Sequence, residues 1–295
     1  MIFARSERRA ATLASRWPGS GFVESTLAEL AWERTRKAVA RWGWAGLFVG
    51  ALVALVAFAP ATWLARGVAS ATQQRLLLAD ARGTVWNGSA VPVLSGGADS
   101  RSAAMLTGRA SWRVGWRGLG LELRLRQPCC IGDEIVLLLS AGFGSLAVQL
   151  PPGQDLLGEW PAAWLVGLGA PWNSLQPEGT LRLSSPGLSL DVAAGRWRLD
   201  GQASLELSDV ASSLSPLDRL GSYLLQVDAK GAQGPTLSLT TLDGALELSG
   251  QGQWTGTQLR FRGEARAAPG FESALDNLLN ILGRRQGAMS TISIG

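Results

Sequence analysis

The sequence predicts a mainly β protein, in which a single N-terminal transmembrane helix precedes an antiparallel β domain that contains one C-terminal helix. Three observations lead to this fold class. Residues 42–65 are apolar and uncharged, short runs after them alternate leucine with polar residues, and 37 glycines accompany a charged fraction of only 17%. Many turns and few charges are typical of β structure rather than of exposed helices.

The apolar segment at 42–65 lies between Arg41 and Arg66. About 20 apolar residues are enough to cross the hydrocarbon core of a bilayer as a helix, so this segment is long enough to span. Amphipathic aromatic residues favour the two membrane interfaces. Three tryptophans near the ends of the segment are therefore candidate membrane anchors: Trp42, Trp44 and Trp63.

A cleaved signal peptide is the alternative interpretation of this segment, because small residues flank Pro60 at a position that resembles a cleavage site. The apolar region of a signal peptide is shorter, about 7–15 residues, and begins near the N-terminus rather than after residue 41. A retained helix is therefore favoured. We expect it to end or kink at Pro60, which lacks an amide donor.

Positive charge is concentrated before the apolar segment. Residues 1–41 hold eight Lys/Arg and four Glu, whereas residues 66–295 hold nineteen basic and nineteen acidic residues. Because cytoplasmic flanks carry the basic excess, we expect 1–41 to be a cytoplasmic N-terminal segment and 66–295 to be exported. The balanced charge also argues against nucleic-acid binding by the exported part, since that requires a basic face.

Period-two patterns recur through residues 179–267. Leucines alternate with polar residues in successive runs, as at Leu181–Leu183 and Leu205–Leu207. Each run presents one apolar and one polar face, which predicts a meander of antiparallel strands. The dipeptides Asp200-Gly201 and Asp243-Gly244 favour tight two-residue hairpins. Such a sheet can close on itself, pack as a sandwich or curve into an open trough.

We expect a weakly two-part exported domain. Less regular strands, including one at 83–90, occupy about 67–150, and a stretch rich in Pro, Gly and Trp joins them to a second part at about 179–295. Residues 271–282 place their leucines on one side of a helix. Residues 289–294 are typical of a last strand.

Cys129 and Cys130 are the only cysteines of the chain and are adjacent. Neighbouring backbone positions disfavour the usual geometry of a disulfide, so two packed thiols are the favoured interpretation. A strained vicinal disulfide and an intermolecular bridge are the alternatives.

The residue content argues against an enzyme. Histidine is absent, which removes the usual acid/base catalyst at neutral pH and the commonest metal ligand. A serine hydrolase would need lysine as its base, but the exported part has only Lys230, without a Ser-x-x-Lys motif around it. The adjacent acids Asp133 and Glu134 fit a solvated loop. We therefore expect no catalytic residue, no metal site and no cofactor.

Trp86 and Trp254 are the candidate interface residues. Both lie in predicted strands flanked by glycine, where a large exposed aromatic side chain contributes binding energy to an interface. The other tryptophans are interpreted as core or interface anchors rather than as a ligand cage.

Five stretches, in this order and spacing, resemble the type II secretion system protein N family. They are PATWLA at 60–65, GTVWNGSA at 83–90, PLDRLGSY at 216–223, TLDGALELSGQG at 241–252 and ALDNLLNILGRR at 274–285. The resemblance extends from about residue 42 to residue 295. The long N-terminal segment is a departure, because members of the family usually begin close to their membrane helix.

The resemblance implies a single-pass protein of the cell inner membrane, with a cytoplasmic N-terminus and a periplasmic β domain. It also implies a structural or assembly role in the type II (general) secretion pathway, carried out by protein–protein interaction. The implied partners are the other inner-membrane platform subunits and the outer-membrane secretin. The oligomeric state stays open.

A lipid-handling β-trough is the alternative function. The family is similar to proteins in which one helix precedes a curved sheet whose apolar face carries or shields acyl chains between membranes. The surroundings of the leucines distinguish the two functions, because covered leucines exclude a trough and leucines along an open groove favour one. The leucines concerned are Leu181, Leu205, Leu246 and Leu248.

Overall fold

The computed structural model describes residues 42–231, 234–255 and 258–294. The chain divides into two units, Met1–Phe58 and Ala59–Gly295. In the first unit, residues 42–57 form a helix with exposed side chains. Within the three described ranges, no helix combines the length and the apolar character needed to cross a membrane.

The single helix predicted over 42–65 is interrupted. The first helix ends before Pro60, which is extended, and a second helix, α2 (Ala61–Ala71), begins directly after it in the second unit. Proline lacks the amide donor that a continuing helix requires. Pro60 instead forms a β-bridge with Thr84. Trp63 therefore lies on α2, beyond the interruption.

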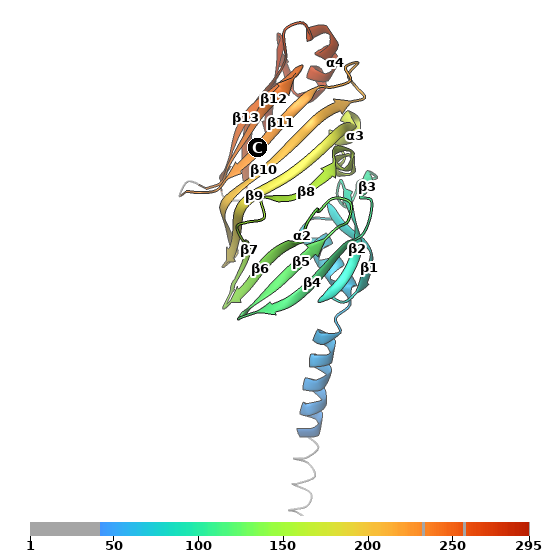
Figure 1. Cartoon of the computed structure of the whole chain (residues 1–295), viewed down its shortest axis with the longest axis vertical. Coiled ribbons are helices and arrows are strands. Elements are labelled where there is room, and N and C mark those ends of the chain that lie inside the picture. The colour runs from blue at the N-terminus through green and yellow to red at the C-terminus, as the bar shows by residue number, and fades with distance from the viewer. Residues whose placement is uncertain (1–41, 232–233, 256–257, 295) are drawn as a thin grey trace, which may run out of the picture. The chain divides into compact units, whose positions relative to one another are not determined.

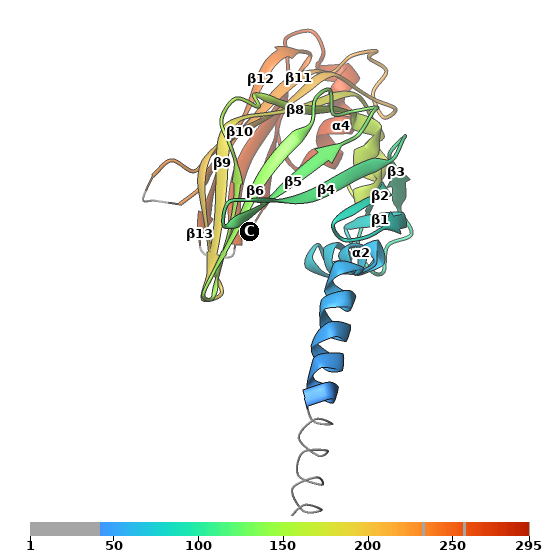
Figure 2. The ribbon, with the colours of Figure 1, turned by 60° about the horizontal axis from the view of Figure 1, so that its bottom comes forward.

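The second unit is built on one antiparallel sheet of 16 strands, which is twisted and curved rather than flat (Figures 1 and 2). The strands are β1 (Leu76–Gly83), β2 (Asn87–Ser95), β3 (Ala103–Met105), β4 (Ala110–Arg117), β5 (Gly120–Arg126), β6 (Ile135–Gly142), β7 (Ser145–Leu150), β8 (Leu156–Pro161), β9 (Pro177–Ala193), β10 (Arg196–Ser212), β11 (Gly221–Asp228), β12 (Thr236–Gly244), β13 (Leu246–Thr255), β14 (Gln258–Ala267), β15 (Arg284–Gln286) and β16 (Met289–Ile294). The mainly β prediction is confirmed, and a single sheet excludes the sandwich.

Strand order in the sheet follows chain order almost throughout. The exceptions are β3, which pairs with β2, β8, which pairs with β9, and β15, which lies outside β16. The two expected parts are not separate, because β7 pairs directly with β9. The Pro- and Trp-rich stretch between them forms β8, the 3-10 helix η1 (Ala162–Leu168) and the short helix α3 (Trp172–Leu175).

The period-two pattern of residues 179–267 is confirmed as β9 to β14. The predicted helix at 271–282 is confirmed as α4 (Glu272–Leu282), and the predicted last strand is β16. The strand predicted over 83–90 is wrong at its centre, because residues 84–86 form the turn between β1 and β2. Thr84 and Asn87 close this turn, since the amide of Thr84 donates to the carbonyl of Asn87 over 2.9 Å.

The two predicted Asp-Gly hairpins are also wrong. Asp200-Gly201 lies within β10, where a Cβ on Gly201 would come within 2.3 Å of the carbonyl oxygen of Gly187. Glycine is needed there for the close approach of β9 and β10 and for a φ of +118°. Asp243-Gly244 ends β12, but β12 and β13 pair only as far as Leu239 and Gly250, so the connection is longer than two residues.

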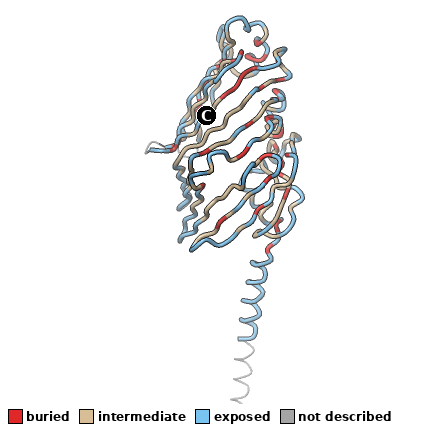
Figure 3. Tube along the Cα trace, viewed as in Figure 1, coloured by how far each residue is buried: buried red, intermediate tan, exposed pale blue. Residues whose placement is uncertain are grey.

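Two hydrophobic clusters lie at different places along the sheet. The larger one forms where α4 packs against the end of β10 to β14, and it includes Leu246, Ala265 and the α4 residues Leu275, Leu278 and Leu279. The smaller one forms where α2 covers β1 to β5 around Trp112. Figure 3 shows half-buried positions along the strands between them. The core is therefore divided rather than continuous.

Candidate interaction site

One apolar face runs across the sheet. Residues that are directly opposed in antiparallel strands point to the same side, so strand register identifies the members of a face. The register links Leu121 to Leu139, Val148, Leu190 and Leu199 through β5, β6, β7, β9 and β10. It links Leu183 to Leu205, Leu225 and Leu239 through β9, β10, β11 and β12. We call these residues the leucine face.

The leucine face is covered only in part. Leu246 is buried and Leu248 is half-buried, and both belong to the cluster under α4. Leu181 is also buried, with 4% of its surface exposed, whereas Leu205 is half-buried and belongs to neither cluster. The sheet thus has an end that α4 covers and a middle in which η1 packs against β9 while leucines such as Leu205 stay half-buried.

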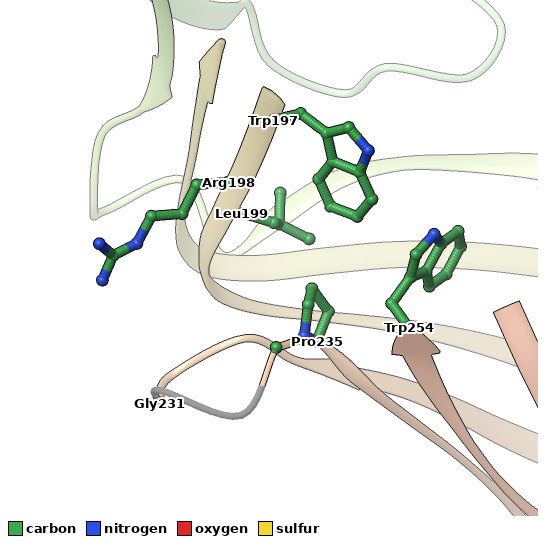
Figure 4. A pocket seen from close by; sticks show the side chains of 7 residues that line it. Trp197, Arg198, Leu199, Gly231, Pro235 and Trp254 are labelled. Atoms are coloured by element: carbon green, nitrogen blue, oxygen red, sulfur yellow. The ribbon is translucent and has the colours of Figure 1, made fainter. Parts of the chain in front are cut away.

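Trp254 lies at the end of β13 and faces Trp197 of β10, whose ring centroid is 5.9 Å away with nearly perpendicular planes. Figure 4 shows the two indoles on one side of the pocket, Leu199 and Pro235 beside them, and Arg198 directed away. The hollow that the two indoles line together with residues such as Leu199 and Pro235 has a volume of about 430 Å³. The predicted interface residue Trp254 therefore forms an aromatic pocket rather than standing alone.

Trp86 lies in the turn between β1 and β2, far along the sheet from Trp254. It is half-buried, and its carbonyl accepts a hydrogen bond of 2.7 Å from the amide of Val114. The neighbouring Val85 accepts a hydrogen bond from the indole of Trp112. The two predicted interface tryptophans thus occupy separate places and do not form one site.

The predicted membrane-anchor tryptophans fall into two groups. Trp42 and Trp44 lie on the helix at 42–57, with 80% and 71% of their surfaces exposed. Trp63 lies on α2 and is 46% exposed. The first two accompany exposed apolar residues of the same helix, such as Phe48 and Leu52.

Strand β1 forms one edge of the sheet. It has eight residues and pairs with β2 on one side, and none of the described strands lies on its other side. The opposite edge is β15, which has only three residues. A long unpaired edge exposes backbone donors and acceptors that a partner strand can use.

A bulge interrupts the pairing of β1 at Asp80, and an arginine fills it. Arg109 donates to the carboxylate of Asp80 and to its main-chain carbonyl, both over 2.6 Å. Arg82 pairs with the same carboxylate at 2.8 Å. Hydrogen bonds from Arg109 and then from Arg82 hold the pKa of Asp80 below its usual value. These contacts fix the shape of the edge strand at the bulge.

The opposite face of the sheet is polar and hollowed at β12 to β14. The hollow has a volume of about 1200 Å³. It is lined mainly by hydroxyl, amide and charged side chains, among them Ser238, Gln251, Arg260, Arg262 and Glu264. This surface is suited to polar contacts and differs in character from the leucine face.

A network of arginine–glutamate ion pairs lies on the β4–β5 hairpin. The carboxylate of Glu122 is largely buried and is bonded by Arg124 and, at 3.0 Å, by Arg117. The bond from Arg124 is the main reason that the pKa of Glu122 is lowered. Arg124 also pairs with Glu134. Glu134, expected in a solvated loop, therefore takes part in a network that stabilises the hairpin.

Cys129 and Cys130 form a disulfide with each other, which corrects the expectation of two thiols. The pair lies in a tight turn, in which the amides of Cys130 and Ile131 both donate to the carbonyl of Gln127. The two cysteines are neighbours in the chain, with Cα atoms 3.7 Å apart, so the disulfide closes within one loop. The carbonyl of Cys130 accepts a hydrogen bond from Glu159 and joins this turn to β8.

Sequence reasoning missed several exposed apolar residues at hairpin turns, chiefly Leu119 and Phe143. Each stands between two glycines, in Gly118-Leu119-Gly120 and Gly142-Phe143-Gly144. A bulky apolar residue at a turn where polar residues are usual was the available signal. Trp197 was missed because its contact with Trp254 depends on the curvature of the sheet.

The fold defines an open, single-sheet β protein with an apolar face, a polar face and an edge strand, β1, that pairs on one side only among the described strands. A family model described as "Type II secretion system (T2SS), protein N" matches residues 74–291. Because this match covers most of the chain, the chain belongs to the type II secretion system protein N family and is a component of that system. The resemblance found in the sequence is confirmed. No curated protein and no solved structure matches the chain.

Proposed function

We propose that this chain is a non-enzymatic assembly component of the type II secretion system, anchored in the cell inner membrane and acting by protein–protein interaction in the periplasm. Membership of the protein N family identifies the pathway as type II secretion. The exposed apolar side chains of the helix at 42–57 support the anchor, and the basic excess of residues 1–41 supports a cytoplasmic N-terminus. Such an anchor would keep the β unit close to other subunits of the same membrane.

The long edge strand β1 is the observation that carries this proposal. A partner segment can add to such an edge as a further strand, because main-chain hydrogen bonds supply affinity without a deep pocket. The bulge at Asp80, fixed by Arg109, limits pairing to a partner of matching shape. We expect the partner to be a platform subunit, and the outer-membrane secretin is the second candidate.

Secretion and cross-linking together test this function. A strain that lacks the gene should retain secretion substrates in the periplasm, and the full chain should restore export. A photo-reactive residue at Ala79, which is exposed on β1, should form covalent adducts with a platform subunit in cells. Thr240 is the matched control, because it is also exposed but lies on a central strand.

Two results would contradict the proposal. One is normal export in the strain that lacks the gene. The other is an equal yield of protein adducts from Ala79 and Thr240, which would mean that the β1 edge is not the contact surface. Adducts between Ala79 and the secretin would support the β1 edge as the contact surface and would identify the secretin, rather than a platform subunit, as the partner.

Lipid handling is the second candidate, and the half-buried middle of the leucine face favours it. Half-buried leucines such as Leu190 and Leu205 offer apolar surface to an acyl chain. Phospholipid should then co-purify with the full chain, and Leu190→Gln should lower the bound lipid while Asp191→Asn, on the other face, should not. Equal lipid content in both variants would argue against the trough.

A further inference from the structure

Two hairpins carry large apolar side chains that almost nothing covers, and the next hairpin along the sheet carries a partly exposed tryptophan. The turn between β4 and β5 carries Trp116, 79% exposed, and Leu119, which is fully exposed. The turn between β6 and β7 carries Phe143, which is also fully exposed. The turn between β9 and β10 is followed by Trp197, 36% exposed.

These hairpins turn at the same end of the sheet. The strands β4, β5, β6, β7, β9 and β10 are consecutive neighbours and antiparallel, so their connecting turns at 117–120, 142–145 and 193–196 lie on one side. In Figure 1 they follow the lower left border, whereas α3 and α4 lie on the right. We call this border the hairpin end and the opposite border the α4 end.

Basic residues accompany the apolar tips. The segments 115–121, 139–146 and 193–198 together contain three arginines and no acidic residue. Arg196 and Arg198 are exposed on either side of Trp197, whereas Arg117, which lies between Trp116 and Leu119, is paired with Glu122 at 3.0 Å. Apolar and aromatic tips flanked by arginine match the interface of an anionic bilayer, where rings lie at headgroup depth and guanidinium groups meet phosphates.

The chain enters the β unit at the same end. The amide of Val85 donates to the carbonyl of Ala59 over 2.9 Å, and Pro60 forms a bridge with Thr84. These contacts hold the first residues of the unit against the turn between β1 and β2, which lies at the hairpin end because β2 runs antiparallel to β4. A membrane helix that ended just before Ala59 would therefore connect to the β unit at the hairpin end.

We propose that the hairpin end docks on an anionic phospholipid surface, with Trp116, Leu119 and Phe143 inserted at headgroup depth. The entry of the chain at this end rests on the membrane anchor of the proposed function, whereas the apolar tips and their arginines stand independently of it. Docking turns the uncovered strands of the leucine face toward the membrane, and it directs the α4 end away from it.

The α4 end serves as the comparison, because a sheet that bound membranes nonspecifically would bind through both ends. It also exposes apolar residues, including Leu242 at 52% and Phe271 at 41%. Acidic residues stand beside them, because Asp243 follows Leu242 and Glu272 follows Phe271. Carboxylates repel anionic headgroups, so these partly exposed residues are suitable controls at the opposite end of the sheet.

Fluorescence from two labelled variants of the full chain tests the proposal. Phe143→Cys and Phe271→Cys would each carry an environment-sensitive dye after reconstitution in vesicles of phosphatidylethanolamine and phosphatidylglycerol. The chain without an added cysteine controls for labelling at Cys129 and Cys130. We expect the dye at 143 to emit at shorter wavelength and to be quenched severalfold more by spin-labelled lipid than the dye at 271.

A charge variant sharpens the test. Arg196→Gln combined with Arg198→Gln should reduce quenching at 143 in these vesicles and should bring it close to the level in pure phosphatidylcholine. A dye at 143 that stays as exposed to water as the dye at 271 would overturn the proposal. So would a dye that is shielded only when solubilised platform subunits are added, since that result would identify a protein interface.

A separate measurement tests whether residues 42–57 anchor the chain in the membrane. Extraction of the vesicles with alkaline carbonate shows whether the chain is integrally inserted. Release by carbonate together with quenching at 143 would contradict the anchor and support docking. Retention without quenching would support the anchor and overturn docking, and the secretion assay is independent of both results.

Discussion

The two ends of the sheet use the same alternating strand pattern with opposite results. At the α4 end, Leu275, Leu278 and Leu279 are at most 1% exposed and fill the space above β13 and β14. At the hairpin end, Leu119 and Phe143 are fully exposed. The difference arises because the leucines of α4 pack onto the sheet, whereas Leu119 and Phe143 lie in turns that extend beyond the strands. The covered end stabilises the unit, and the open end is available for binding.

The largest expected effect is the loss of stability when a cavity is created in the hydrophobic cluster at the α4 end. Leu278→Ala should lower the free energy of unfolding by about 3 kcal/mol, because a fully buried leucine leaves a cavity when it is truncated. Leu119→Ala at the open end should change it by less than about 0.5 kcal/mol. Chemical denaturation of both variants measures the contrast, and equal losses would show that the two ends do not differ.

A smaller effect is expected from Tyr223 at the covered end. Its hydroxyl is buried and donates to the carbonyl of Leu246 over 3.0 Å. Tyr223→Phe should cost about 1 kcal/mol, because this carbonyl loses its partner. Denaturation at neutral pH checks the loss, and an unchanged midpoint would mean that the bond contributes nothing.

The same tyrosine predicts a dependence on alkaline pH. Burial raises the pKa of Tyr223 above its ordinary value. The folded state therefore keeps the proton when the unfolded chain begins to lose it, near pH 10. The contribution is complete below that pH and is lost as the pH rises beyond it. Wild type should lose stability between pH 9 and 11 more steeply than Tyr223→Phe, and parallel curves would contradict this assignment.

The smallest effect is expected at Glu122 on the β4–β5 hairpin, where Arg124 lowers the pKa of the carboxyl. A lowered pKa contributes stability above the ordinary value of about 4.3, and this contribution is lost as the pH falls through the folded value. Glu122→Gln should flatten the stability profile between pH 6 and 3. Denaturation midpoints across that range measure it, and an unchanged slope would remove Glu122 from the acid-sensitive groups.

Local patterns predicted the elements better than their arrangement. Alternating leucines identified β9 to β14, and helical spacing identified α4. The turn predicted at Asp200-Gly201 is wrong because Gly201 lies inside a strand, where the absence of a side chain allows the backbone to approach Gly187 closely. Whether a leucine is covered depends on which helix folds over it, and that contact joins residues far apart in the chain. Leu119 and Phe143 carried a local signal, since each stands between two glycines.

Photo-cross-linking in living cells tests the difference between the two ends most directly. A photo-reactive residue would replace Leu119 at the hairpin end in one chain and Phe271 at the α4 end in another. After irradiation and purification, mass spectrometry of the labelled peptides would show what each position contacts. Our account predicts phospholipid on the peptide that contains position 119 and none on the peptide that contains position 271. Lipid on both peptides, or on neither, would contradict it.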